Sequence, residues 1–248
     1  MIDLHSHILP GVDDGPDSLD EAKAMCRLAY ETGCRLLVAT PHRRRDEWAD
    51  RPRAELRERL AELAGALDVP LELALGSELR VDSELVRELA ASEPDELPTL
   101  GDSRALLLEF EPRGIGPEPL AIVAELVERG FRPVVAHPEL TPCLHGQTAL
   151  VGELRAAGAA VQVTAMSLTG EFGRPARIAV HALVEAGFVD AVASDAHRLE
   201  WRPPILARAR TEVVRNWGEE VAAALFETNA RSLLAPTASG GFAREAFA

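Results

Sequence analysis

The sequence predicts an α/β fold in which parallel strands alternate with helices, and two observations predict this class. Short and almost continuously apolar segments recur along the chain, as is typical of a parallel sheet that helices cover. A glycine stands between a predicted helix and the next apolar segment, where a left-handed residue ends the helix. This succession occurs at Gly33, Gly130, Gly158 and Gly187.

About seven strands are expected along the chain. The first is identified by alternation of apolar and polar residues, and the others by short apolar runs. In chain order they cover residues 2–7, 35–40, 71–76, 105–110, 132–137, 160–163 and 189–193.

The helix starts carry their own signals. Ser18, with Glu21 three residues later, forms a capping box that predicts a helix to about Thr32. Helices over residues 52–67 and 117–128 are expected because each begins with proline, whose missing N–H costs little in a first turn.

The length and the net charge of the chain limit the possible classes of protein. The chain has 248 residues, enough for one large domain, and no linker divides it. We therefore expect one domain over residues 1–235, closed by helices from Pro203 onward and followed by a flexible tail at residues 236–248. The formal net charge of −14 disfavours binding to nucleic acid or to an anionic membrane.

The cysteines and the apolar runs indicate the compartment. Cys26, Cys34 and Cys143 have no metal-ligand spacing and no disulfide framework. Free thiols fit a reducing compartment, so a cytoplasmic location is expected. No apolar run is long enough to cross a bilayer.

Histidines and carboxylates stand where the predicted strands end. In the first strand, the period of two places Asp3, His5 and His7 on one face. Similar residues lie at or just after the ends of later apolar runs: His42, Glu78, Glu109, His137, Asp195 and His197. Imidazole nitrogens and carboxylate oxygens together suit zinc, manganese or iron. Ligands from six strand ends must converge, which favours a barrel over a doubly wound sheet and predicts a metal-dependent enzyme.

Several segments carry a family resemblance. The opening segment, Ile2-Asp3-Leu4-His5-Ser6-His7 and onward to Pro16, resembles the PHP (polymerase and histidinol phosphatase) superfamily. More narrowly, it resembles the bacterial manganese-dependent protein-tyrosine-phosphatase branch that is associated with capsule and exopolysaccharide regulation. The motifs agree in order over residues 1–235, and the supporting segments are residues 39–42, 76–78, 108–110, 136–139, 167–170 and 193–197.

The resemblance implies a distorted seven-stranded (β/α) barrel of the PHP type that holds three divalent metal ions. Manganese is the expected metal, with iron, zinc or cobalt as alternatives. The resemblance assigns three residues to each ion: His5, His7 and Asp195 to the first; Glu78 (bridging from the first), Glu109 and His137 to the second; and Asp14, His42 and His197 to the third.

The implied activity is hydrolysis of a phosphomonoester by a hydroxide that bridges metal ions. Such clusters lower the pKa of a shared water and hold the attacking and leaving oxygens of a phosphoryl group. The expected catalytic residues are Glu78, the bridging carboxylate, and Arg202, which matches the arginine with which this branch grips phosphate. The implied substrate is a phosphotyrosine protein or peptide, such as the tail of a bacterial tyrosine kinase.

One departure from the branch concerns the substrate. The branch usually continues His-Pro-Glu-Arg, whereas this chain has Leu140 after Glu139, and leucine cannot hold a phosphate. The arginines at residues 43–45, or Arg113, could compensate from neighbouring loops. Met166 also stands where the branch tends to carry a small residue. Both changes touch substrate recognition more than metal binding.

Two other functions stay open. The substrate could be a small phosphorylated metabolite, as in a histidinol-phosphatase-like enzyme, or the protein could be a metal-bound regulatory module without catalysis. An aryl phosphate needs little acid catalysis because phenol has a pKa of about 10, which favours phosphotyrosine. An amidohydrolase with a carbamylated lysine is excluded, because the single lysine, Lys23, lies inside the first predicted helix.

Five further polar residues receive lesser roles. Asp13 is interpreted as a turn residue that could also take the place of Asp14 as a metal ligand. Asp3 and Glu139 are candidates for supporting the ligands from behind. His145 and His181 are expected to be structural.

Overall fold

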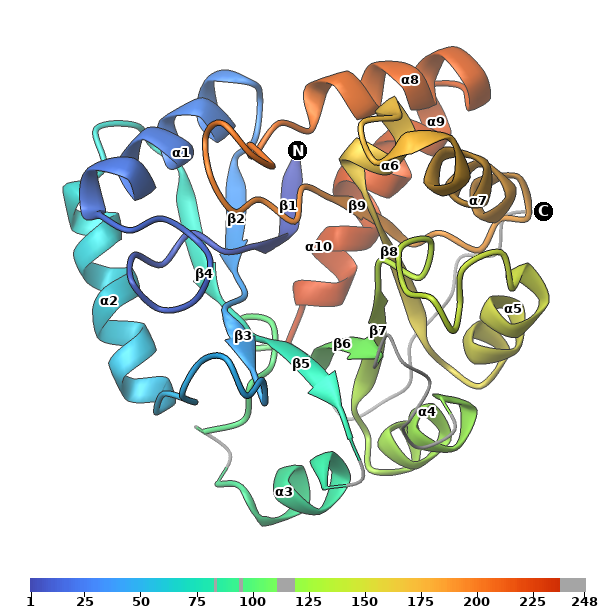
Figure 1. Cartoon of the computed structure of the whole chain (residues 1–248), viewed down its shortest axis with the longest axis horizontal. Helices are drawn as coiled ribbons and strands as arrows, with labels where there is room; N and C mark the ends of the chain where they lie inside the picture. The colour runs from blue at the N-terminus through green and yellow to red at the C-terminus, as the bar shows by residue number, and fades with distance from the viewer. Residues whose placement is uncertain (83, 94–95, 111–118, 237–248) are drawn as a thin grey trace.

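The computed structural model describes residues 1–82, 84–93, 96–110 and 119–236. Three predictions therefore lie outside the described residues: Arg113, the helix start near residue 117, and the tail at residues 237–248. Strands and helices alternate along the chain, and the helices surround the strands (Figure 1). The predicted α/β class with parallel strands is confirmed.

The strands of the described part form two parallel sheets. One has the order β1-β2-β4 and the other the order β3-β5-β6-β7-β8-β9. Every pairing of neighbours is parallel. The bounds are β1 (Ile2–Ser6), β2 (Leu36–Ala39), β3 (His42–Arg43), β4 (Glu72–Leu75), β5 (Glu78–Val81), β6 (Ala105–Phe110), β7 (Arg132–Ala136), β8 (Ala160–Thr164) and β9 (Ala191–Ala193).

Each of the seven expected segments contains a strand, but β3 and β5 were not expected. They follow β2 and β4 after breaks at Pro41 and Gly76, where proline offers no N–H and glycine is tightly packed. A Cβ at Gly76 would lie 2.6 Å from Leu100 Cδ2. His42 and Glu78 therefore open new strands instead of following old ones.

Hydrogen bonds continue the pairing at the strand breaks and link the two sheets between β1 and the segment after β9. Across the break, Gly76 N–H donates to the Ala39 carbonyl at 2.7 Å, so that pairing continues between the same two chain segments. At the other edge, Asp195 N–H donates to the His5 carbonyl at 2.9 Å, which connects the segment after β9 to β1. The first and last strands of the chain are therefore neighbours.

Two of the helices begin where their sequence signals predict. The Ser18 hydroxyl accepts a hydrogen bond from Glu21 N–H at 3.2 Å, and α2 begins after Pro52. The bounds are α1 (Leu19–Glu31), α2 (Arg53–Ala66), α3 (Leu85–Ala91), α4 (Pro119–Glu128), α5 (Thr148–Ala156), α6 (Ala165–Thr169), α7 (Gly173–Glu185), α8 (Ala207–Trp217), α9 (Glu219–Ala223), the π-helical turn η1 (Ala224–Thr228) and α10 (Asn229–Leu234). Within the described ranges, no helix has both the length and the apolar character that a membrane span requires.

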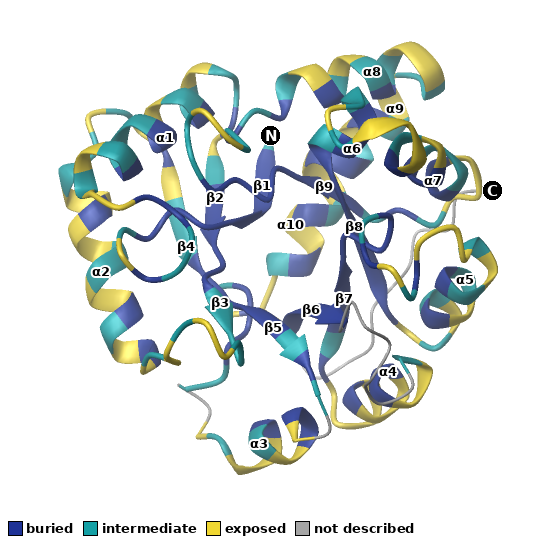
Figure 2. Cartoon of the chain, in the orientation of Figure 1, coloured by how far each residue is buried: buried dark blue, intermediate teal, exposed yellow. Residues whose placement is uncertain are grey.

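Helix α10 covers the end of the molecule where the strands begin. Leu233 shares a core cluster with Ile2 and Ala105, which open β1 and β6. Arg132, at the start of β7, donates to the Ser232 carbonyl at 2.8 Å. Apart from β3 and β4, the strands are mostly buried, whereas the surrounding helices expose their outer faces (Figure 2). The carboxyl ends of the strands therefore meet at the opposite end of the molecule.

Candidate metal centre

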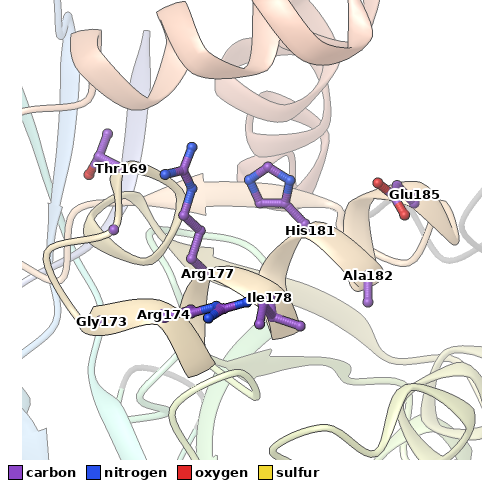
Figure 3. A pocket seen from close by; sticks show the side chains of 9 residues that line it. Thr169, Gly173, Arg174, Arg177, Ile178, His181, Ala182 and Glu185 are labelled. Carbon is purple, nitrogen blue, oxygen red and sulfur yellow. The ribbon is translucent and has the colours of Figure 1, made fainter.

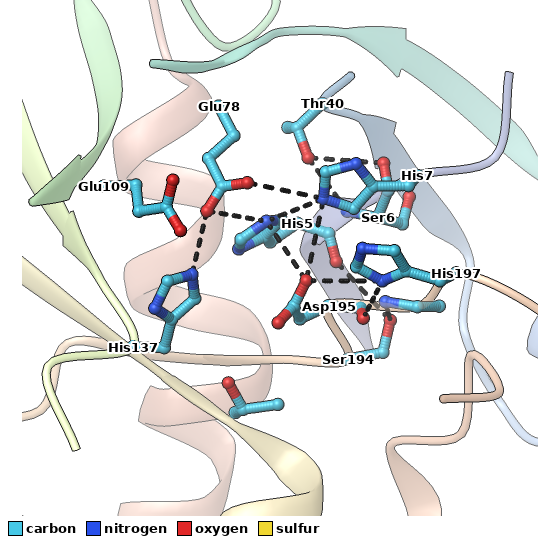
Figure 4. Close-up of polar contacts among 12 residues, drawn as sticks. His5, Ser6, His7, Thr40, Glu78, Glu109, His137, Ser194, Asp195 and His197 are labelled. Atoms are coloured by element: carbon cyan, nitrogen blue, oxygen red, sulfur yellow. Dashed lines mark hydrogen bonds and ion pairs between the residues drawn. The ribbon is translucent and has the colours of Figure 1, made fainter. Parts of the chain in front are cut away.

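The nine residues predicted as metal ligands come together at the carboxyl ends of the strands (Figure 4 shows seven of them). In each of four groups, candidate ligand atoms lie within 4.8 Å of one another. The groups are His7, Asp14, His42 and His197; His5, Glu78 and His137; His5, His7 and Asp195; and His42, Glu78 and Glu109. Elements from β1 to the loop after β9 contribute, so the site depends on the whole fold.

His5 and His7 direct their Nε2 atoms to the same point. His5 Nδ1 donates to Gln162 Oε1 at 3.0 Å, and His7 Nδ1 donates to Asp13 Oδ2 at 2.8 Å. These hydrogen bonds leave Nε2 of each neutral ring as the acceptor, and the two Nε2 atoms face one another at 3.2 Å. Two facing lone pairs repel unless a cation lies between them or one nitrogen takes up a proton.

Glu78 lies between the histidines and directs its two oxygens to different ones. Oε1 is 2.8 Å from His137 Nε2 and 3.6 Å from His5 Nε2. Oε2 is 2.7 Å from His42 Nδ1 and 3.6 Å from His7 Nε2. This is the arrangement required of a carboxylate that bridges two cations.

Three buried ligand atoms fit bound cations because they have no hydrogen-bond partner among the described residues: Asp14 Oδ1, His42 Nδ1 and Glu78 Oε2. His42 Nδ1 and Glu78 Oε2 are close but not oriented for a hydrogen bond. Asp14 Oδ1 lies 3.3 Å from His42 Nε2 and 3.4 Å from His197 Nε2. Buried polar atoms are costly when unsatisfied, and a cation would satisfy all three.

Burial and neighbouring charges shift the pKa values in opposite directions within the cluster. Burial opposes the charged form of His42, but the nearby carboxylates of Glu78 and Asp14 overcome it and raise the pKa of His42 to about 10. His137 is also buried, and Glu78 raises its pKa to about 9. Burial and the nearby His197 and His42 lower the pKa of His7 to about 4. The raised pKa values favour protonated imidazoles around Glu78 in the metal-free protein.

Glu109 shares a group of candidate ligand atoms with His42 and Glu78. Its charge also acts on the nearby His137. Arg45 forms an ion pair with the Glu109 carboxylate, and Arg80 Nε lies 3.8 Å from the same oxygen. Burial and the charge of Glu78 raise the pKa of Glu109.

The backbone is strained at three residues of the site. His137, Asp195 and Arg202 have φ values of 32°, 52° and 56°. In the described part, Arg44 is the only other non-glycine residue with positive φ. Such conformations cost on the order of 1–3 kcal/mol each and persist at functional sites, where the surrounding structure enforces them.

A cavity of about 230 Å³ opens onto the cluster. Arg202 lines it, with Nη2 at 3.2 Å from Asp195 Oδ2 and its guanidinium 4.9 Å from the Phe172 ring centre. Arg45 and Leu140 also line it. The cavity therefore joins candidate metal ligands to two arginines and an apolar wall.

Two residues that support the ligands, Gln162 and Asp13, have weak signals in the sequence. Gln162 is a buried amide within the apolar strand β8, and that interruption was the available signal. Asp13 is a turn residue, as predicted, since its Oδ1 accepts from Gly15 N–H at 3.1 Å. Its Oδ2 also holds His7 and accepts from His42 N–H at 2.9 Å.

The other polar residues lie at a distance from the candidate ligand atoms. Asp3 Oδ1 accepts from Ser194 N–H at 3.0 Å, and burial raises the pKa of Asp3 to about 6. Glu139 Oε1 accepts from Thr164 N–H and from the Ser167 hydroxyl, both at 2.8 Å. These carboxylates anchor the loops that carry ligands.

A larger groove of about 780 Å³ lies along α7 (Figure 3). Its side chains include Arg174, Arg177, His181 and Glu185, and none of the nine predicted ligands lines it. His181 packs against the Trp217 ring, with the ring centres 4.9 Å apart, as expected of a structural histidine. His145 donates from Nδ1 to the Glu139 carbonyl at 2.6 Å.

Fold and site together define a class: parallel α/β proteins with a cluster of imidazole and carboxylate ligands at the carboxyl ends of the strands. Residues 1–235 match the family described as capsular polysaccharide synthesis, CpsB/CapC, and the chain belongs to this family. This confirms the resemblance found in the sequence.

The relatives are similar over nearly the whole chain. Tyrosine-protein phosphatase YwqE of Bacillus subtilis is 34% identical over 237 residues, covering 94% of this chain and 91% of the relative. Tyrosine-protein phosphatase CpsB of Streptococcus pneumoniae is 31% identical over 242 residues, covering 94% and 98%. The structure matches one from the crystal structures of YwqE and CpsB, described as unique metal-dependent tyrosine phosphatases, with a TM-score of 0.87, 34% identity and 94% of each chain covered.

Proposed function

We propose that this protein is a metal-dependent protein-tyrosine phosphatase. The observation that carries the proposal is the cluster of nine imidazole and carboxylate side chains, three of them with unsatisfied buried ligand atoms. Seven of the nine line a cavity that two arginines also line. The relatives that share the fold at 30% identity or more are named tyrosine-protein phosphatases.

We infer that the nine residues hold three divalent ions, with manganese first and iron, zinc or cobalt as alternatives. The groups around His5, His7 and Asp195, and around Asp14, His42 and His197, support the first and third assignments. The second ion would take Glu78, Glu109 and His137. Bound ions would supply Lewis acidity and lower the pKa of a coordinated water.

The residues of the chain would bind and orient the substrate. The Arg202 guanidinium, held in place by Asp195 and the Phe172 ring, would donate hydrogen bonds to two phosphoryl oxygens. Gln162 and Asp13 would keep His5 and His7 in the tautomer that presents Nε2. A phenolate leaving group, with a conjugate-acid pKa of about 10, needs little protonation, which favours phosphotyrosine over an alkyl phosphate.

We further infer that the strands form one distorted seven-stranded barrel within a domain of residues 1–235. Counting β2 with β3 and β4 with β5 as single interrupted strands gives this number. Pairing across the Gly76 break and between Asp195 and His5 supports a closed ring.

The proposed substrate is phosphotyrosine on a flexible protein segment, such as the tail of a bacterial tyrosine kinase, and the proposed location is the cytoplasm. Free thiols at Cys26, Cys34 and Cys143 support the latter. The alternatives are a small phosphorylated metabolite as substrate or a metal-bound regulatory module.

The test compares initial rates on p-nitrophenyl phosphate and on a phosphotyrosine peptide, with manganese and with chelator, for the wild type and His5→Ala. Manganese-dependent hydrolysis of both substrates that the variant loses is the expected result. Hydrolysis of the small ester alone would indicate a metabolite phosphatase. If the metal-loaded protein hydrolysed neither substrate, the result would indicate a regulatory module without catalysis.

A further inference from the structure

We propose that Arg45 is a second phosphate-binding residue and forms, with Arg202, a two-arginine clamp across the cavity. This rests on the proposed phosphatase function. Within the arginine triplet that follows His42, the structure separates Arg45 from its neighbours. Arg45 lines the cavity. Arg43 pairs with Asp50 and Glu88 instead, and Arg44 with Asp82 and Glu88.

The two arginines are held in corresponding ways. Arg45 pairs with the Glu109 carboxylate, and Arg202 Nη2 lies 3.2 Å from Asp195 Oδ2. Both carboxylates belong to the candidate metal cluster. The Arg45 and Arg202 side chains are 17% and 18% exposed, so both are largely withdrawn from solvent yet open to the cavity.

This pairing couples the arginines to metal binding. A cation that coordinates Glu109 draws the carboxylate charge toward itself and weakens the attraction for Arg45. The guanidinium remains charged at any physiological pH, so it then needs another anion. A phosphoryl group entering the cavity supplies one, and a bidentate fork matches two of its oxygens.

The chemistry of the cavity walls also favours a second cationic side chain beside the bound ions. A phosphomonoester dianion enters a cavity whose walls include the carboxylates of Asp14, Glu78, Glu109 and Asp195. Leu140, on the same wall as Thr141 and Pro142, offers no donor in its side chain. Arg45, in the loop after β3, therefore supplies the positive charge that Leu140 does not provide in the loop after β7.

The test measures inorganic phosphate binding to the manganese-loaded enzyme by calorimetry, beside kcat and KM on p-nitrophenyl phosphate and metal content per chain. The variants are Arg45→Met, the matched control Arg44→Met, and the double variant Arg45→Met/Leu140→Arg. We expect Arg45→Met to weaken phosphate binding and raise KM by about 10- to 100-fold at unchanged metal content. Arg44→Met should behave as the wild type, and Leu140→Arg should restore part of the loss.

The proposal is overturned if Arg45→Met binds phosphate as the wild type does. It is also overturned if the variant loses metal in proportion to its loss of phosphate, because Arg45 would then only position Glu109. Phosphate binding does not require turnover. If the wild type bound phosphate but hydrolysed no ester, the proposed phosphatase function would be overturned. Phosphate binding to the variants would still test whether Arg45 and Arg202 form the clamp.

Discussion

At the scale of single residues, the candidate metal centre depends on side chains that do not themselves face the cations. Gln162 and Asp13 select the tautomers of His5 and His7 through hydrogen bonds to Nδ1. Such partners fix ring orientation and raise ligand basicity. The sequence motif indicates the histidines, but Gln162 carries no motif of its own, and its role becomes visible only in the fold, where its side chain contacts His5 from β8.

Replacing Gln162 with leucine should remove the hydrogen bond that selects the tautomer of His5. We expect Gln162→Leu to weaken manganese binding by about 10- to 100-fold, because His5 loses the acceptor that fixes its ring. Isothermal titration of the chelator-treated protein measures the effect. Gln147→Leu is the control, since Gln147 is exposed at the start of α5 and makes no side-chain capping bond. Equal affinities for the two variants would contradict the role given to Gln162.

The metal-free site should also make stability depend on pH. Folded pKa values of about 10 for His42 and about 9 for His137 lie above the ordinary value of 6.5. A raised pKa contributes stability that is fully present below pH 6.5 and is lost as pH rises through the folded values. We therefore expect the free energy of unfolding of the metal-free protein to fall from about pH 6.5 to about pH 10.

Urea unfolding at a series of pH values, after chelator treatment, measures this fall. The manganese-loaded protein is the control, because coordinated imidazoles carry no titrating proton and should not produce the decline. A metal-free protein whose stability stays level or rises across this window would show that protons do not occupy the site as described.

At the scale of elements, the interruption of two strands places the ligands. The apolar runs correctly indicated β2 and β4, yet the two-residue strand β3 is too short for any periodicity to reveal. The breaks depend on tertiary packing as well, since Gly76 lies against Leu100 and Thr40 from other parts of the chain. Sequence could therefore predict which residues gather, but not that His42 and Glu78 begin strands.

A methyl group at this break should disturb both fold and site. In Gly76→Ala, the Cβ would lie 2.6 Å from Leu100 Cδ2 and 3.2 Å from Thr40 Cγ2, so we expect a loss of about 1–3 kcal/mol in unfolding free energy. Chemical denaturation measures it. Gly65→Ala is the matched control, because nothing lies within 4 Å of its Cβ and the position is helical, where alanine is favoured by about 0.5–1 kcal/mol. Similar behaviour of the two variants would refute the packing argument at Gly76.

At the scale of the whole molecule, the cluster joins the beginning of the chain to its later parts. His5 lies in β1 and His7 directly after it, whereas Asp195 and His197 follow β9, and Glu78 lies close to histidines from three parts of the chain. A protein with a formal net charge of −14 also gathers carboxylates at this point. Cations bound there would neutralise repulsion and connect segments that separate on unfolding.

Manganese should therefore stabilise the entire fold and not only the loops around it. A ligand that binds only the folded state at 100 times its Kd adds about 2.7 kcal/mol, so we expect Tm to rise with manganese concentration. Calorimetric melting of the wild type, His5→Ala and His181→Ala measures this. His181→Ala should respond as the wild type does, because His181 lies on α7 outside the cluster, and His5→Ala should respond much less. If manganese raised Tm equally in all three proteins, the ions would be binding elsewhere on the acidic surface, and His5 would not be one of their ligands.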